Sequence, residues 1–141
     1  MYSSNCTAGT GANSARDTLL TNVTHVFLGK NSNGITNIRS ITGYTFAYCN
    51  NLKYIDFADG LVNIGTRAFF SVSNLSEVNI ISGTISTIGG FAFGDAFNTS
   101  SSLIKDLIID GNVTNLGANA FANLNNGNFD TLQFGSPEKK W

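Results

Sequence analysis

The sequence predicts a solenoid of the α/β type, with a short curved parallel sheet, about five repeats and little helix. Two submotifs alternate along the 141-residue chain, and the spacing inside each submotif is constant. The spacing between submotifs varies, as it does where surface loops differ in length. In repeat proteins one unit cannot bury its apolar face alone, so stacked coils share a continuous core.

The first submotif, apolar-x-x-apolar-x-apolar, occurs five times. Its last two apolar positions are two residues apart, which is the period of a strand with one buried face. The segments start at residues 23, 52, 75, 104 and 129, which gives repeats of 29, 23, 29 and 25 residues. Its apolar positions are Val23, Val26 and Leu28; Leu52, Ile55 and Phe57; Leu75, Val78 and Ile80; Ile104, Leu107 and Ile109; and Phe129, Leu132 and Phe134. We expect five short strands in one parallel sheet about 20 Å across.

The second submotif, apolar-x-x-apolar with a Phe five residues later, lies between these strands. Its positions are Ile38, Ile41 and Phe46; Leu61, Ile64 and Phe69; Ile85, Ile88 and Phe93; and Val113, Leu116 and Phe121. We expect the four Phe side chains to stack as a spine, each contributing about 1.5–3 kcal/mol on burial. Gly65, Gly89 and Gly117 follow the second apolar position, which indicates a positive φ or a close backbone approach. Thr42 breaks this pattern, so the first turn is expected to differ.

The repeats define one domain with polar ends. We assign residues 1–22 to an N-terminal polar leader or cap, residues 23–135 to the repeat domain and residues 136–141 to a polar tail. Terminal repeats of a solenoid are usually atypical. Leu19 and Leu20 are therefore expected to form a short helical turn that closes the first coil.

Several segments carry a family resemblance. The run IGTRAF, the strand that follows it from Leu75 to Ile80, and the stretch TFAYCNNLKYIDF resemble the leucine-rich repeats of BspA-like bacterial surface proteins. The resemblance covers residues 23–134, and the repeat lengths fall within the roughly 20–29 residues of leucine-rich repeats. It implies a leucine-rich repeat solenoid. It also implies an extracellular or cell-surface protein that binds host or neighbouring proteins without catalysis.

The two cysteines allow at most one disulfide. Cys6 lies in the polar leader, whereas Cys49 follows the Phe of the first repeat by three residues. The later repeats have Val72, Ala96 and Leu124 at the same offset. Cys49 is therefore expected to fill the core rather than to act as a chemical group. The spacing leaves a Cys6–Cys49 bond open but favours free thiols.

Composition excludes several classes of partner. The chain has 8 Lys and Arg against 9 Asp and Glu, a net charge of -1, and charged residues make up only 12% of it. Because a nucleic-acid binder needs a basic surface to neutralise phosphates, we expect no nucleic-acid partner. No stretch approaches the roughly 20 apolar residues that span a bilayer, and the N-terminus lacks a charged region followed by an apolar run. We therefore expect no membrane insertion and no signal peptide in the sequence as given.

Alternation along the strands predicts an outward face. Its positions are His25, Phe27 and Gly29; Tyr54, Asp56 and Ala58; Glu77, Asn79 and Ile81; Asp106, Ile108 and Asp110; and Thr131, Gln133 and Gly135. Aromatic anchors beside fixed charges are typical of protein interfaces, and outward Ile and Phe exceed what solubility requires. The alternative is a set of ordinary β-forming residues kept soluble by charge. We assign ten positions to partner binding: His25, Phe27, Tyr54, Asp56, Glu77, Asn79, Asp106, Ile108, Thr131 and Gln133.

Catalytic arrangements find little support. His25 is the only histidine, and nothing in the spacing brings it together with Ser76 or Thr131 for serine hydrolase chemistry. Asp106 and Asp110 would lie about 13 Å apart along a strand at 3.3 Å per residue, beyond the gap of roughly 5–9.5 Å between glycosidase carboxylates. We therefore expect no enzyme.

Metal and cofactor binding are not expected either. Asp56, Glu77 and Asp106 could hold calcium across adjacent strands, but carboxylates on an exposed sheet face usually interact only with water. The glycine runs GTGAN and GGFAFG lack the pattern of phosphate-binding loops, so they are interpreted as turns. Two functions remain. The first is a non-catalytic protein-binding or adhesion module of a secreted or cell-surface protein. The alternative is a structural or assembly repeat within a larger surface, fibre or phage-type protein.

Overall fold

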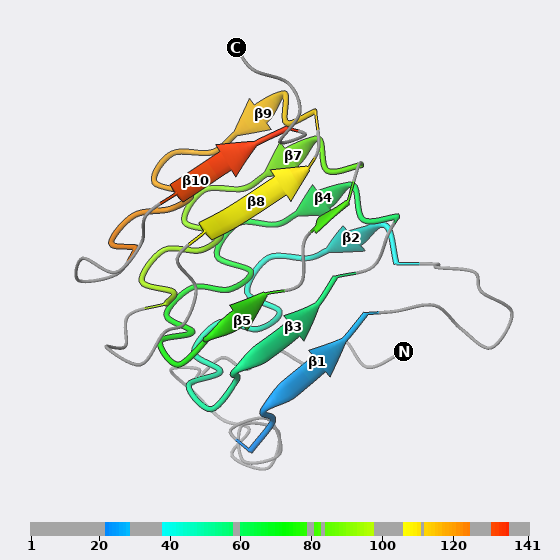
Figure 1. Ribbon diagram of the computed structural model, residues 1–141. Coiled ribbons are helices and arrows are strands. Elements are labelled where there is room, and N and C mark those ends of the chain that lie inside the picture. Colours follow the sequence, from blue (N-terminus) through cyan, green and yellow to red (C-terminus); the bar gives the residue numbers. More distant parts are fainter. Residues whose placement is uncertain are drawn as a thin grey trace, which may run out of the picture.

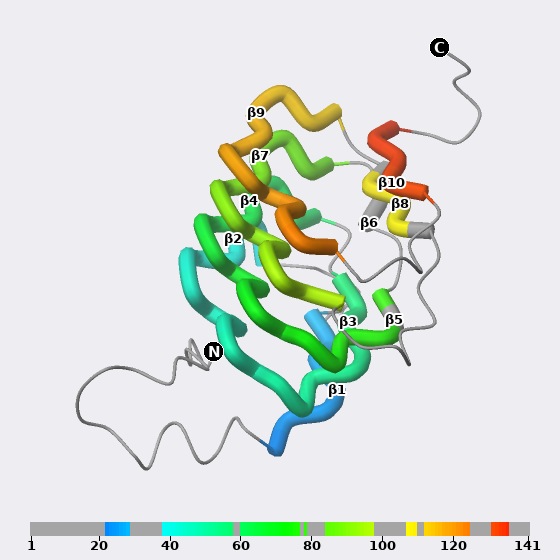
Figure 2. Tube along the Cα trace, turned by 90° about the vertical axis from the view of Figure 1, so that its left-hand side faces the viewer, coloured from blue at the N-terminus to red at the C-terminus, as the bar shows by residue number. Residues whose placement is uncertain are grey.

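The chain folds as a parallel β-solenoid. The computed structural model describes residues 22–28, 38–57, 60–78, 81–82, 84–97, 106–110, 112–124 and 131–135. Over these ranges the chain winds in successive coils that add strands to two sides of the molecule (Figures 1 and 2). The predicted repeat solenoid with parallel sheets is confirmed. No helix occurs in the described ranges, so the secondary structure there is β rather than α/β.

One side carries the five predicted strands. They are β1 (His25–Phe27), β3 (Tyr54–Asp56), β5 (Glu77–Val78), β8 (Asp106–Asp110) and β10 (Thr131–Phe134), joined by the additional short strand β6 (Ile81–Ser82). All pairings are parallel, in the sheet orders β1-β3-β5 and β10-β8-β6. The expectation of one five-stranded sheet is therefore wrong, because β3 and β8 pair with different parts of the third repeat.

A shift of register accompanies this division. Tyr54 lies opposite Glu77, as the repeat spacing predicts, but Ile109 lies opposite Ile81 rather than Ile80. The third repeat thus contains one residue more between its two pairings than the predicted register allows. Since side chains alternate along a strand, a slip of one residue exchanges its two faces. In this register the partner of the buried Ile109 is Ile81 in place of Ile80.

A second sheet forms in segments for which the sequence pattern predicted no strand. It consists of β2 (Ser40–Ile41), β4 (Asn63–Ile64), β7 (Thr87–Ile88) and β9 (Asn115–Leu116), in the order β2-β4-β7-β9. Each strand is two residues long and holds the second apolar position of the second submotif. Two residues are too few to display alternation, so the pattern predicted buried positions here without predicting a sheet.

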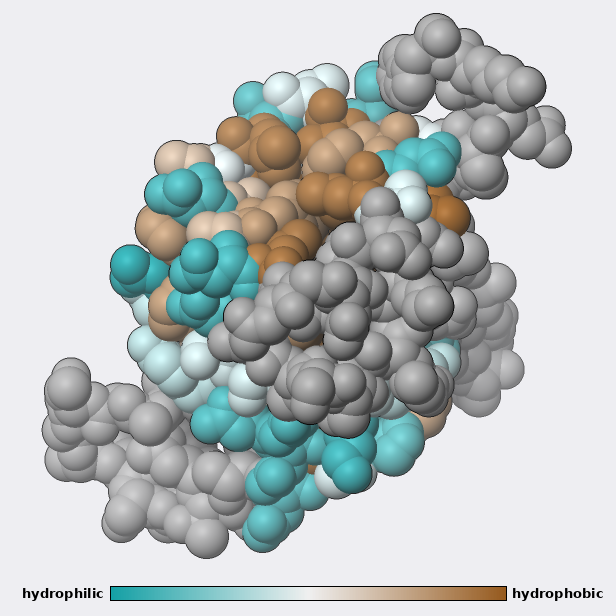
Figure 3. All heavy atoms as spheres, turned by 60° about the vertical axis from the view of Figure 1, so that its left-hand side comes forward, coloured by the Kyte–Doolittle hydropathy of each residue, from teal (hydrophilic) through white to brown (hydrophobic). Residues whose placement is uncertain are grey.

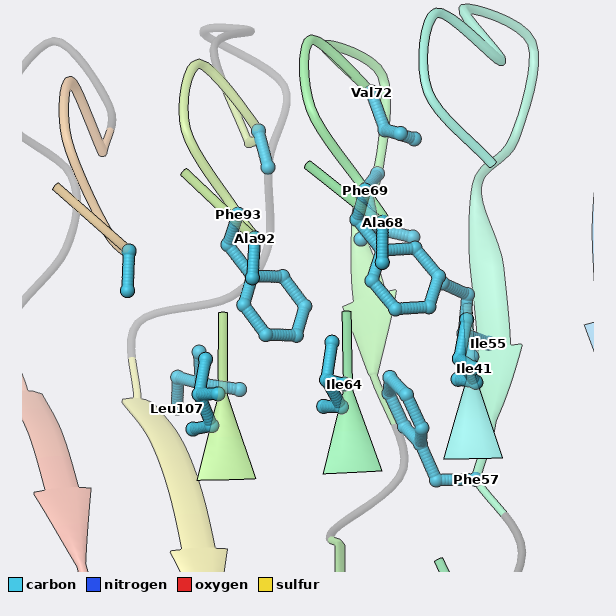
Figure 4. Close-up of a cluster of buried hydrophobic side chains, with 14 of the residues drawn as sticks. Ile41, Ile55, Phe57, Ile64, Ala68, Phe69, Val72, Ala92, Phe93 and Leu107 are labelled. Carbon is cyan, nitrogen blue, oxygen red and sulfur yellow. The ribbon is translucent and has the colours of Figure 1, made fainter. Parts of the chain in front are cut away.

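The predicted phenylalanine spine is present in the core. Phe46, Phe69, Phe93 and Phe121 stack in sequence with centroid separations of 5.2, 5.1 and 5.3 Å and interplanar angles of 11°, 10° and 6°. The interior rings of Phe69 and Phe93 are fully buried and lie one beside the other in successive coils (Figure 4). Phe57 adds an edge contact to Phe69 at 5.5 Å. The spine is therefore a continuous aromatic column that links the coils.

Close packing of the backbone explains why glycine recurs directly after the second apolar position of the repeat. A Cβ built on Gly65 would lie 2.5 Å from the Gly43 nitrogen and 2.7 Å from the Thr42 carbonyl carbon. None of the three repeat glycines has a positive φ. Glycine is therefore required at this position by the close approach of two backbones, and not by its φ angle. Positive φ values occur instead at non-glycine residues of the turns, among them Tyr44, at 61°. Thr42 fits because its side chain is exposed.

Some predictions fall outside the described residues, and one is corrected. The described ranges do not include residues 1–21 of the leader, among them Leu19 and Leu20, or the tail 136–141. Cys49 is 1% exposed and belongs to the core, as expected. It is also disulfide-bonded, so the expectation that Cys49 is a free thiol without a chemical role is wrong. The other cysteine, Cys6, lies outside the described residues.

Candidate binding face

Strands β1 and β3 bring three predicted site residues into one aromatic cluster, formed by His25, Phe27 and Tyr54. The ring centroids of Phe27 and Tyr54 lie 5.5 Å apart, those of His25 and Tyr54 5.8 Å, and those of His25 and Phe27 6.3 Å. The parallel register sets His25 opposite Tyr54, so all three side chains are on the same face. The cluster follows directly from the period-two pattern.

The aromatic cluster is open to solvent. Phe27 is 67% exposed, the largest exposed fraction among the exposed large hydrophobic residues of the described ranges, and His25 is exposed as well. Tyr54, on the neighbouring strand, is half-buried. The Thr24 hydroxyl is hydrogen-bonded to Nδ1 of His25 at 2.9 Å, which orients the imidazole. An exposed Phe that is held against two other rings costs little ordering entropy when a partner covers it.

The remaining predicted residues of this sheet lie beside the cluster. Asp56 is half-buried and opposite Phe27 in the register, so a carboxylate adjoins the aromatic cluster. The backbone of Glu77 is opposite Tyr54. Asn79 lies outside the described residues.

The other predicted residues belong to a different sheet. Asp106 pairs with Thr131, and Ile108 pairs with Gln133, in the sheet formed by β6, β8 and β10. Ile108 and Gln133 are half-buried, and Thr131 is exposed. The structure therefore does not join the ten predicted residues in one continuous sheet.

The C-terminal strand departs from the predicted alternation. Leu132 was expected to face the core but is 37% exposed. Strand β10 is at the edge of its sheet, so among the described coils none follows to cover it.

A second aromatic group, on the turns, was not predicted. The Arg67 guanidinium lies 5.7, 5.6 and 5.3 Å from the ring centroids of Tyr44, Phe70 and Phe91, and its Nη1 donates a hydrogen bond of 2.6 Å to the Tyr44 hydroxyl. On the side formed by the turns, hydrophobic residues gather among hydrophilic ones (Figure 3). The sequence contains a signal for this group, since Tyr44, Arg67 and Phe91 all follow the second apolar position by three residues. Because Arg67 already occupies the space between these rings, the group stabilises the turns.

The three positions of the possible calcium site fall in two different sheets. Asp56 is opposite Phe27 and Glu77 is opposite Tyr54, so residues 56 and 77 are not directly paired in the backbone register. Asp106 is in the other sheet, so it does not lie on a strand adjacent to either. Within the part of the chain that the structure describes, no group of three His, Cys, Asp or Glu residues could hold a metal ion. The searched segments also contain no helix with the length and apolar character of a membrane span.

These features define a class of protein: a repeat solenoid in which short strands present an exposed face while a stacked core joins the coils. Comparison with known families assigns the chain more closely. Residues 30–136 match the BspA type leucine rich repeat region in six copies, and the chain belongs to that family. The comparisons with curated proteins and with solved structures gave no match.

Proposed function

We propose that this chain is a non-catalytic protein-binding module of a secreted or cell-surface protein, and that it contacts its partner through the aromatic cluster of His25, Phe27 and Tyr54. The observation that carries this proposal is the exposure of Phe27 within that cluster. Aromatic residues are enriched among the few residues that dominate the energetics of protein interfaces.

The surroundings of the cluster suit a protein partner. Asp56 provides a charge at its margin, and β1 leaves one backbone edge unpaired within the described residues. An interface commonly combines an apolar centre with a polar rim. Leucine-rich repeats commonly mediate protein interactions, which favours the same interpretation.

Two observations support an extracellular or cell-surface location. BspA-type repeats are typical of surface or secreted bacterial proteins. The disulfide at Cys49 is a second argument, because structural disulfides persist mainly in oxidising compartments.

The test starts with a partner obtained from a protein array or a pull-down and measures its affinity for variants of the module. Phe27→Ala and Tyr54→Ala should each weaken binding by at least about 1 kcal/mol, roughly fivefold in Kd. Tyr48→Ala is a matched control, because Tyr48 is an aromatic residue that is 38% exposed but lies on the turns. Melting curves of all three variants check that the fold is retained. If Tyr48→Ala loses affinity while the strand variants retain it, the turns form the interface and the proposal is wrong.

A further inference from the structure

The last described coil ends in a row of open hydrogen-bond donors. Inside the solenoid, alternate N–H groups of each turn donate to carbonyl groups of the next turn. Between the third and fourth turns the bonds are Phe91 to Ala118 at 3.1 Å, Phe93 to Ala120 at 2.7 Å, and Asp95 to Ala122 at 2.9 Å. The equivalent N–H groups of the last turn belong to Asn119, Phe121 and Asn123, and no acceptor for them lies in the described segments.

The first described turn presents the matching acceptors. The carbonyl groups of Thr66, Ala68 and Phe70 accept hydrogen bonds from the first turn at 3.1, 2.8 and 2.8 Å. Their equivalents one coil earlier are the carbonyl groups of Gly43, Thr45 and Ala47, which receive no backbone donor from the ranges described. Open edges of this kind are templates for pairing with another chain. The two ends of the solenoid are therefore complementary in hydrogen bonding.

Apolar packing at the last coil is also incomplete. Leu116 is 54% exposed, whereas its equivalents Ile64 and Ile88 are fully buried. Phe121, the last ring of the spine, is half-buried, whereas Phe93 is fully buried. In the interior each coil is covered by the one that follows it (Figure 2). The surface formed by β9 and residues 117–123, hereafter the open end, thus presents the donors and apolar side chains that a further coil covers in the interior of the solenoid.

Stacking imposes a steric condition on that coil. A Cβ on Gly117 would lie 2.5 Å from the Gly89 carbonyl carbon, and a Cβ on Gly65 would lie 2.7 Å from the Thr42 carbonyl carbon. A Cβ at this position therefore points at the backbone of the preceding coil. In the first coil the position is held by Thr42, whose branched Cβ would collide with the open end of another copy.

We propose that the open end docks one further repeat coil that has glycine directly after its second apolar position, and that Thr42 excludes a second copy of this chain from docking there. The donor row supplies hydrogen bonds, and Leu116 and Phe121 supply apolar contact. Glycine at the Thr42 position is the specificity determinant, because it alone lets the two backbones approach. This inference is independent of the proposed role of the aromatic cluster, which lies on the other sheet.

Thr42→Gly supplies the proposed partner coil in the protein itself. The Gly-Gly pair that it creates already occurs in this fold at Gly89–Gly90, so the variant is expected to fold. Sedimentation equilibrium from about 10 to 300 µM should show a monomeric wild type, while the weight-average mass of Thr42→Gly should reach at least twice that of the monomer. Thr42→Ala is the matched control. It also loses the hydrogen bond between the Thr42 and Thr45 hydroxyl groups, at 3.0 Å, but keeps the Cβ and should stay monomeric.

Three results would overturn the proposal: a monomeric Thr42→Gly with native circular dichroism, association of Thr42→Ala to the same extent, or association of the wild type. Hydrogen exchange of the wild type gives a test that does not depend on the variant. The amides of Asn119, Phe121 and Asn123 should exchange at least about 100-fold faster than those of Phe91 and Phe93. Equal protection would show that the donor row is not open.

Discussion

Removal of one ring from the phenylalanine spine should destabilise the protein severely. Phe69 is fully buried and contacts Phe46, Phe93 and Phe57 at centroid distances of 5.2, 5.1 and 5.5 Å. Burial of one Phe is worth about 1.5–3 kcal/mol, and each aromatic pair adds about 0.5–1.5 kcal/mol. The cavity left by Phe69→Ala would collapse little, because the backbone of residue 69 is fixed by its hydrogen bond to Ala92 at 2.7 Å.

We therefore expect Phe69→Ala to lower the free energy of unfolding by about 3–5 kcal/mol, a large part of the roughly 5–15 kcal/mol of an ordinary domain. Urea denaturation followed by circular dichroism measures the loss, with the slope checked because repeat arrays can unfold in parts. Phe46→Ala, at a half-buried ring with one stacked partner in the spine, should cost less. Phe27→Ala, at an exposed ring, should cost least. Equal losses in the three variants would refute the assignment of the spine to the core.

Two further predictions concern the turns and the carboxylates. Gly65→Ala should lower the free energy of unfolding by about 1–3 kcal/mol, because its Cβ would meet the backbone of the preceding coil. Thr42→Ala, at an exposed side chain, should change the free energy of unfolding little in the same urea denaturation experiment. The melting temperature should be the same in millimolar calcium and in a chelator, because Asp106 lies in a different sheet from Asp56. A rise of several degrees with calcium would show that a metal site exists.

The core was predictable because it depends on local periodicity. The two apolar positions of each strand and the Phe of each turn recur at fixed offsets, and Ile55, Ile109, Phe69 and Phe93 are all fully buried. The aromatic cluster was predictable for the same reason. His25, Phe27 and Tyr54 follow from strand alternation and from the equivalence of repeats, without knowledge of any long-range contact.

The division of the sheet was not predictable from the repeat pattern. The third repeat contains two adjacent isoleucines, and the pattern allows either Ile80 or Ile81 to pair with Ile109. The choice between them depends on pairing with strands distant along the chain, which the repeat pattern does not specify. The same limit applies to β2, β4, β7 and β9, whose two residues become a sheet only when four coils stack.

The sequence by itself determined the repeat, the buried positions, the phenylalanine spine and the alternation that exposes Phe27, because each depends on residues close together along the chain. Tertiary structure decided which strands share a sheet, why glycine is needed at the turn, and where the two ends of the solenoid differ. These depend on contacts between coils 22 to 28 residues apart, such as Tyr44 to Thr66 and Ile81 to Ile109, and the backbone approach at Gly65 exists only once the coils have stacked.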